Sequence, residues 1–168
     1  MRTILIALCL ILTAGAADVT VVRDYPITDT EGVIDRDGVE FNKTLTTDRN
    51  GSLALKADDA TTFRLYETGD LDLEETLIIY QAKMKTLNVK GDAYLEMWCR
   101  FPGRGEYFSR GLQYALSGTQ DWVSVETPFV LRKGENPDNI RLNVVVTGKG
   151  RVWLDEVRIV KSELPAGN

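Results

Sequence analysis

Tyr94 and Trp98 are the residues whose type and spacing most directly suggest a chemistry. They lie four positions apart in a segment in which apolar and polar side chains alternate. Side chains on a β-strand alternate between its two faces, so both rings would project from one face, roughly 13 Å apart along the strand. Sugars present apolar C–H faces fringed by hydroxyl groups, which stack on exposed aromatic rings and hydrogen-bond to polar neighbours. The pair therefore predicts a carbohydrate-binding surface that contacts two sugar units.

The polar side chains around these two rings would form the edges of that surface. Glu96 and Arg100 alternate with the aromatic residues on the same face, and flanking strands would add the other polar groups. The predicted ligand-binding residues are Tyr94, Trp98, Glu96, Arg100, Lys83, Arg141 and Asn143. The assignment depends on strict alternation, because a shift of one residue would exchange the outer face for the core. The alternative is that a loop or the second sheet covers both rings.

The opposite set of side chains in this segment is apolar and predicts the core side of the strand. It comprises Ala93, Leu95, Met97, Cys99 and Phe101. If the other face formed the core, Glu96 and Arg100 would be buried without partners, at a cost on the order of several kcal/mol. The outward orientation of Trp98 follows from that difference.

Composition excludes several classes of function. The 168 residues carry 20 Lys and Arg against 25 Asp and Glu, a net charge of −5, which argues against a nucleic-acid binder or an anionic-membrane binder. Histidine is absent, which removes the imidazole base, the histidine-containing triads and most catalytic zinc sites. Nothing marks an acidic pair, such as Glu96 with Glu126, as the two carboxylates of a glycosidase. The sequence therefore predicts a non-catalytic protein.

The N-terminal segment has the pattern of a secretory signal peptide. Met1 and Arg2 precede an unbroken apolar run over residues 4–12, and small residues at 13–17 provide a cleavage site. The apolar run is too short to remain as a membrane-spanning helix. We therefore predict a signal peptide over residues 1–17, a secreted or periplasmic location and no transmembrane anchor. Cleavage would remove Cys9 and leave Cys99 without a partner for an internal disulfide.

The rest of the chain predicts short strands separated by turn residues such as Asp37-Gly38 and Asn50-Gly51. The predicted strands cover residues 20–23, 39–42, 52–56, 61–66, 77–86, 93–101, 107–112, 122–131, 140–147 and 151–161. We expect one all-β domain over residues 18–161, folded as an antiparallel two-sheet sandwich, and a flexible tail over 162–168. The segments 77–86, 93–101 and 140–147 would share the sheet that displays Trp98.

Four segments together resemble a known family. They read GDAYLEMW over residues 91–98, SGTQDW over 117–122, NIRLN over 139–143 and GKGRVWLDEV over 148–157. Their order resembles that of galactose-binding-like jelly-roll domains, which include many carbohydrate-binding modules of secreted bacterial glycosidases. The resemblance covers roughly residues 51–161 and implies a two-sheet jelly-roll β-sandwich. It implies less about the ligand, because the motifs are mostly turn and core residues and the family also contains domains that bind other proteins.

The resemblance also implies a structural calcium ion. Many of these domains hold one through the aspartate of the closing motif, and Asp155 occupies that position, with Glu156 where a second aspartate is common. Calcium takes about six to eight oxygen ligands. Glu31, Asp35 and Asp37 could supply some of them, although no motif selects among these residues. The alternative is that Asp155 accepts hydrogen bonds from backbone amides at a strand bulge.

Two functions remain open on the sequence alone. The first is secreted, non-catalytic carbohydrate binding through the concave outer face of the sheet around Trp98, with a poly- or oligosaccharide as the partner. The second is a protein–protein interaction or a structural role in the cell envelope, with an envelope protein as the partner and no sugar ligand. In both cases we expect a monomer that binds no nucleic acid.

Overall fold

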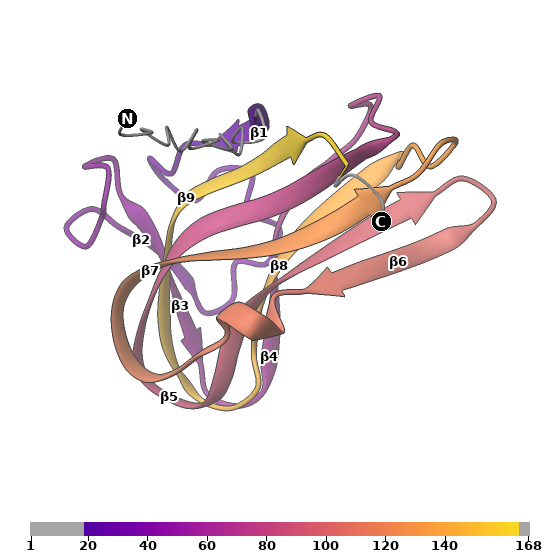
Figure 1. Cartoon of the computed structure of the whole chain (residues 1–168). Helices are drawn as coiled ribbons and strands as arrows, with labels where there is room; N and C mark the ends of the chain where they lie inside the picture. The colour runs from indigo at the N-terminus through magenta and orange to yellow at the C-terminus, as the bar shows by residue number, and fades with distance from the viewer. Residues whose placement is uncertain (1–18, 165–168) are drawn as a thin grey trace, which may run out of the picture.

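The computed structural model describes residues 19–164, which form nine β-strands and one short 3-10 turn (Figure 1). The strands are β1 (Thr20–Tyr25), β2 (Val39–Asn42), β3 (Ser52–Ala57), β4 (Thr61–Thr68), β5 (Thr76–Phe101), β6 (Gly105–Arg110), β7 (Leu116–Leu131), β8 (Asn139–Val146) and β9 (Gly150–Ser162). The turn, η1 (Leu112–Tyr114), follows β6. No α-helix occurs within residues 19–164, so the predicted all-β class is confirmed.

The predicted signal peptide, residues 1–17, lies outside the described residues. At the other end, β9 includes Ser162, the first residue of the predicted tail, and residues 165–168 lie outside the described range. Within residues 19–164 there is also no helix with the length and apolar character needed to cross a membrane.

The long strand β5 organises the fold, because its two halves belong to different sheets. Residues 76–87 pair with β7 and β9, whereas residues 93–101 pair with β6 and β8. Between the halves, Asn88 (φ 54°) and Gly91 (φ 88°) have left-handed backbone angles, and the register with β7 shifts repeatedly. The strand bends there, at the curved end of the molecule in Figure 1. As a consequence, core-facing residues are even-numbered before the bend and odd-numbered after it.

The strands hydrogen-bond as one nine-stranded sheet, which the bend in β5 folds into two antiparallel layers that we call the first and the second sheet. The first sheet has the order β2-β3-β9-β5-β7, and β1 pairs with the C-terminal part of β9. The second sheet has the order β4-β8-β5-β6. The predicted two-sheet sandwich is confirmed. The expectation that residues 77–86 and 93–101 lie side by side in one sheet is wrong, because they are successive halves of one bent strand.

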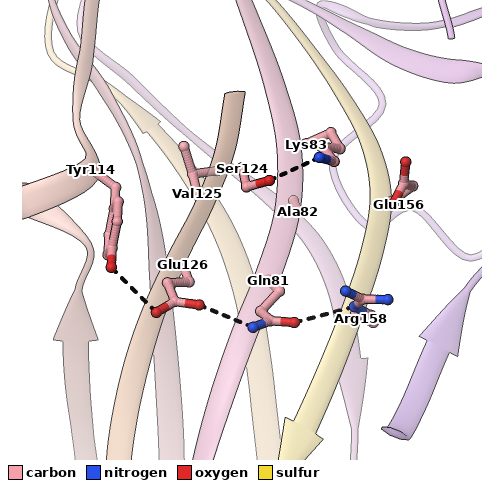
Figure 2. Close-up of a pocket in the computed structure, with 9 residues that line it drawn as sticks. All are labelled: Gln81, Ala82, Lys83, Tyr114, Ser124, Val125, Glu126, Glu156 and Arg158. Carbon is pink, nitrogen blue, oxygen red and sulfur yellow. Dashed lines mark hydrogen bonds between the residues drawn. The ribbon is translucent and has the colours of Figure 1, made fainter. Parts of the chain in front are cut away.

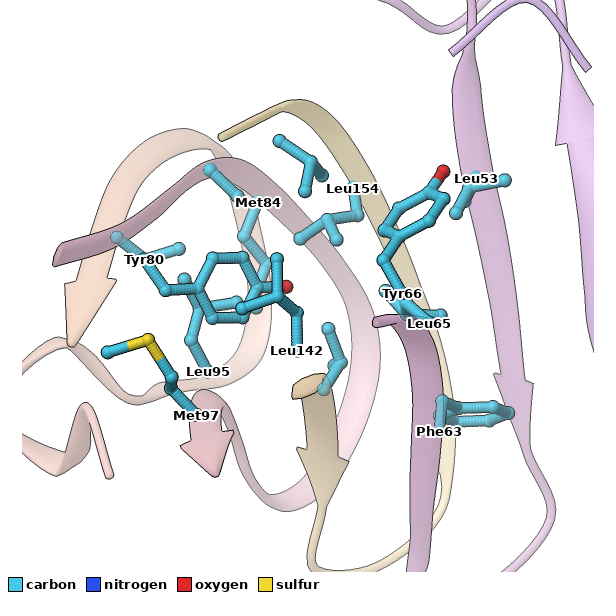
Figure 3. Packing of buried hydrophobic residues seen from close by; sticks show 14 of the residues in the cluster. Leu53, Phe63, Leu65, Tyr66, Tyr80, Met84, Leu95, Met97, Leu142 and Leu154 are labelled. Carbon is cyan, nitrogen blue, oxygen red and sulfur yellow. The ribbon is translucent and has the colours of Figure 1, made fainter. Parts of the chain in front are cut away.

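The inner faces of the two sheets pack together to form the hydrophobic core (Figure 3). The first sheet contributes Leu53, Tyr80, Met84 and Leu154, and the second contributes Leu65, Leu95, Met97 and Leu142. The core set predicted between Ala93 and Phe101 is buried at every position. Burial also raises the pKa of the Cys99 thiol to about 12, which keeps the thiol protonated and unreactive at neutral pH.

Candidate ligand-binding site

The outer face of the second sheet carries a depression of about 450 Å³. We call its lining the Trp98 face, which consists of Thr62, Arg64, Glu96, Trp98, Arg110, Arg141 and Asn143. Strand register places these side chains in rows: Glu96 lies opposite Asn143 on β8 and opposite Arg110 on β6, and Trp98 lies opposite Arg141 on β8. The structure therefore brings together four of the predicted residues, namely Trp98, Glu96, Arg141 and Asn143.

Glu96 is the buried centre of the Trp98 face, with 4% of its surface exposed. Its Oε1 accepts hydrogen bonds from Trp98 Nε1 (2.7 Å) and Asn143 Nδ2 (3.1 Å), and its Oε2 accepts one from Arg110 Nε (2.8 Å). Burial raises the pKa of Glu96, but the hydrogen bonds from Arg110, Trp98 and Asn143 and the nearby Arg110 charge outweigh that effect. The net result is a pKa below the ordinary value, so Glu96 is ionised and orients its neighbours.

Trp98 is half-buried and lies beside a second aromatic ring, that of Phe108 on β6. The ring centroids are 4.9 Å apart with the planes tilted by 41°, and Phe108 is 48% exposed. The Arg110 guanidinium lies 4.5 Å from the Phe108 centroid, and the Arg141 guanidinium lies 6.0 Å from that of Trp98. Two rings and two guanidinium groups thus form a mixed apolar and hydrogen-bonding surface.

Phe108 was not among the predicted binding residues, although the sequence contains the signal needed to find it. The connection at 102–104 joins β5 to β6 as a tight hairpin, in which Phe101 pairs with Gly105. Counting outward from that pair places Phe108 opposite Trp98 and Arg110 opposite Glu96. Hairpin register therefore identifies two members of this surface that alternation along one strand cannot.

Two arginines of the Trp98 face, Arg141 and Arg64, are held by acidic residues at its margins. Arg141 Nη2 donates to Glu106 Oε1 (2.8 Å), and Arg141 Nε lies 3.4 Å from Glu67 Oε1. Arg64 forms an ion pair with Asp35 (2.8 Å), and its hydrogen bonds lower the pKa of the Asp35 carboxyl. These ion pairs fix the guanidinium groups without covering the depression.

Arg100 and Tyr94 share the outer side of β5 with Trp98, but neither lines the depression. Arg100 is exposed and donates to Asp138 Oδ1 (2.8 Å), beyond the end of the Trp98 face. The prediction that Tyr94 is accessible is wrong, because only 7% of its surface is exposed. The reason lies in the next segment of chain: Gly111 N–H donates to the Leu95 carbonyl (2.9 Å), so the backbone entering η1 runs alongside this part of β5.

The placement of Lys83 beside Trp98 is also wrong. Lys83 lies in the first half of β5, on the outer face of the first sheet, where it lines a separate depression of about 270 Å³ (Figure 2). Its Nζ donates to Ser124 Oγ (2.8 Å). The neighbouring Gln81 links Glu126 (2.9 Å) to Arg158 (3.2 Å) in a second set of hydrogen bonds. Lys83 therefore belongs to the polar surface of the other sheet.

Glu126 lies in this same depression, whereas Glu96 lies on the Trp98 face of the opposite sheet. A glycosidase needs its two carboxylates to flank one bond, about 5–10 Å apart. Glu96 and Glu126 line different depressions, so they do not flank one shared site.

Asp155 is buried in β9, next to a bulge at which Glu156 has a left-handed backbone (φ 50°). Its Oδ2 accepts hydrogen bonds from Thr47 N–H (2.6 Å), Thr47 Oγ1 (2.9 Å) and Thr46 Oγ1 (3.0 Å). Its Oδ1 accepts one from Glu156 N–H (2.7 Å). Asp155 thus joins the loop after β2 to the bulge in β9, as the hydrogen-bonding alternative expects.

These contacts do not make a ready set of calcium ligands. Both oxygens of Asp155 accept hydrogen bonds, and one carboxylate supplies at most two of the roughly six to eight oxygen ligands that calcium takes. Among residues 19–164, no group of three or more acidic or cysteine side chains gathers around one point. Asp35, one of the suggested ligands, is paired with Arg64 instead. The calcium ion therefore stays a prediction, which the stability of Asp155 variants tests below.

No family model and no curated protein sequence matches the chain. Solved structures do match. The CBM22-1 xylan-binding domain from Paenibacillus barcinonensis is 15% identical with a TM-score of 0.64, and the match covers 90% of this chain and 99% of that one. The CBM22-1–GH10 modules of a Clostridium thermocellum endo-1,4-β-D-xylanase, complexed with xylohexaose, are 12% identical with a TM-score of 0.62, over 90% of this chain and 30% of that one.

A family 61 carbohydrate-binding module in complex with β-1,4-galactotriose is 12% identical with a TM-score of 0.54, over 82% of this chain and 97% of that one. At these identities the similarity establishes the fold and leaves the ligand open. The two matched structures that the alignment covers almost completely are binding modules. The protein thus has the β-sandwich fold of the carbohydrate-binding modules that it matches.

Proposed function

We propose that the protein is a secreted, non-catalytic module that binds carbohydrate at the Trp98 face. The observation that carries the proposal is the aromatic ring of Trp98, which lines one depression together with Arg141 and Asn143 and packs against the exposed ring of Phe108 beside it. Ring faces stack on the C–H faces of sugars, while guanidinium and amide groups hydrogen-bond to hydroxyl groups. Glu96 pre-orients three of the surrounding side chains, which reduces the entropy lost on binding.

The structural neighbours support a polysaccharide or oligosaccharide as the ligand. These neighbours are a xylan-binding domain, a structure complexed with xylohexaose and a structure in complex with β-1,4-galactotriose. Because these sugars differ, the fold alone does not select one. The predicted signal peptide over residues 1–17 supports secretion, which would place the module where extracellular glycans occur.

The first test removes in turn the ring of Trp98 and the neighbouring ring of Phe108. Trp98→Ala and Phe108→Ala should each weaken the binding of a responsive oligosaccharide by about 1–3 kcal/mol, measured by calorimetric titration over a neutral glycan panel. Phe108→Ala keeps the test valid if Trp98→Ala lowers stability, because Phe108 is exposed and carries no hydrogen bond to Glu96. Trp122→Ala, on the first sheet, is the matched control and should bind normally. Unchanged binding in both ring variants would exclude this face as the sugar site.

The second candidate function is binding of an envelope protein. The exposed apolar side chains Tyr107, Leu112 and Tyr114, on β6 and the following turn, favour it. This function predicts that no glycan of the panel binds, while a partner purified from envelope extract is lost when Leu112 and Tyr107 are replaced by Ser. The glycan titration therefore separates the two functions.

A further inference from the structure

A basic groove lies at the curved end of the molecule, away from the residues of the Trp98 face. Its volume is about 500 Å³, and four of its lining residues are cationic. These are Lys56 on β3, Lys90 in the bend of β5, Lys149 in the turn after β8 and Arg151 on β9. Asp58 is the acidic residue in the lining, and Leu87 adds an apolar side chain that is 41% exposed. A cluster of four cations is notable in a chain whose net charge is −5.

The fold holds these cations close together. Lys56 lies directly opposite Arg151 on the neighbouring strand, and Arg151 in turn lies opposite Leu87 on β5. Lys90 N–H donates to the Lys149 carbonyl (2.7 Å), which joins the bend of β5 to the turn before β9.

Gly150 makes that approach possible. A Cβ at this position would lie 2.6 Å from the Cα of Val89, and its φ of 153° is unfavourable for other residues. The close packing of the two turns therefore fixes the spacing of the basic side chains.

This arrangement places like charges next to one another, because Lys56 and Arg151 are cross-strand neighbours. Like charges directly opposite one another on adjacent strands are destabilising. The one compensating ion pair in the groove, Lys56 with Asp58 at 3.0 Å, involves side chains that are 58% and 81% exposed and contributes little. An anion in the groove would relieve the repulsion between the cations.

We infer that the basic groove binds the carboxylate groups of an acidic polysaccharide, one that contains uronic-acid units. Lysine ammonium groups attract carboxylates as point charges, and Leu87 offers an apolar contact for the C–H face of the same sugar ring. Asp58, in the turn between β3 and β4, lines the groove, and Thr62, on the following strand β4, lines the Trp98 face. The inference rests on the proposed function and adds to it a second site, which contacts the carboxylates of an acidic ligand.

The test compares acidic fragments of polygalacturonate and polyglucuronate with their neutral methyl esters, by calorimetric titration at low salt. We expect the acidic fragments to bind, and we expect added salt to weaken their binding, because salt screens exposed charges. The double variant Lys90→Gln/Lys149→Gln should bind them about five- to tenfold more weakly. The matched control Lys43→Gln/Lys133→Gln removes the same charge from exposed sites outside the groove and should bind within about twofold of the unchanged protein.

Three results would overturn the inference. The first is that the methyl esters bind as tightly as the acidic fragments. The second is that the control variant loses as much affinity as the double variant in the groove. The third is that duplex DNA or vesicles of anionic lipid bind as tightly as the acidic fragments. If a neutral oligosaccharide binds through Trp98 and Phe108 but no acidic fragment binds, the inference about the groove is rejected and the proposed function is kept. If neither neutral oligosaccharides nor acidic fragments bind, both the inference and the proposed function are rejected.

Discussion

At the scale of single residues, Glu96 shows what alternation along a strand predicts and what it does not. Its position on the outer side of β5 was predictable, because the odd-numbered residues form the better core. Its burial was not, because that burial depends on Arg110 and Asn143, which arrive from neighbouring strands and supply the hydrogen bonds. Tyr94 shows the same difference: it lies on the predicted face of the strand, yet little of its surface is exposed. Alternation therefore predicts the face of a residue, whereas the surrounding strands decide its exposure.

The buried Glu96 carboxylate predicts a pH-dependent contribution to stability. Its folded-state pKa lies below the ordinary value of 4.5, so the stabilisation is complete above the unfolded-state pKa and is lost as the pH falls through the folded-state pKa. Glu96→Gln places an amide NH₂ against Arg110 and should lower the free energy of unfolding by about 1–3 kcal/mol at neutral pH. Urea unfolding at neutral and at strongly acidic pH measures the difference, which should shrink at acidic pH.

Glu40→Gln is the control for this experiment, because Glu40 is exposed on β2. It should leave the unfolding free energy unchanged at both pH values. A Glu96→Gln penalty of the same size at neutral and acidic pH would show that the carboxylate charge is not what stabilises the Trp98 face.

Asp155 predicts a second stability effect, which also decides the calcium question. Asp155→Ala removes the acceptor of four hydrogen bonds and should lower the free energy of unfolding by about 2–4 kcal/mol, with or without a chelator. Thermal unfolding in calcium and in excess chelator measures both proteins. If the chelator alone lowers the melting temperature of the unchanged protein to that of the variant, the ion rather than the hydrogen bonds is responsible, and the calcium prediction is correct.

At the scale of elements, most strands were predictable and the bend in β5 was not. Segments 39–42, 52–56 and 140–147 match β2, β3 and β8 closely, because apolar–polar alternation between turn residues specifies a half-buried strand. Residues 87–92 contain Asn88, Gly91 and Asp92, which favour turns, so the chain is easily divided there into two strands. Only the pairing with β7, which runs through the bend, keeps β5 continuous. The misplacement of Lys83 follows from that single error.

The bend therefore predicts a glycine requirement. Gly91 has a φ of 88°, and a Cβ there would lie 2.4 Å from Thr147 Oγ1 on the neighbouring turn. Gly91→Ala should lower the free energy of unfolding by about 1–3 kcal/mol, through backbone strain and that contact. Gly103→Ala in the β5–β6 hairpin is the control, because its φ is also positive (69°) but no atom lies within 4 Å of its Cβ position. Equal losses in the two variants, measured by chemical denaturation, would mean that the contact with Thr147 contributes nothing.

At the scale of the whole molecule, the sandwich class and its family resemblance could be predicted, because they depend on turn and core residues that are local in sequence. The composition of each surface could not, because residues far apart in the chain build it. Thr62 and Arg110 meet on the Trp98 face, and Lys56 and Lys149 meet in the basic groove. A net charge of −5 likewise conceals a local cluster of cations. The fold class follows from local sequence patterns, whereas a binding surface depends on how the fold brings distant residues together.

The most direct test of the central claim is an NMR titration that follows the indole N–H signals of the three tryptophans. Neutral oligosaccharides, including xylohexaose and β-1,4-galactotriose, are added in turn to the isotopically labelled protein. Trp98 lies on the proposed site, while Trp122 lies on the first sheet and Trp153 is buried in β9, so the molecule contains its own controls. We predict that at least one sugar shifts the Trp98 signal saturably and leaves the other two in place. A shift confined to Trp122 or Trp153, or no shift with any sugar, would contradict carbohydrate binding at the Trp98 face.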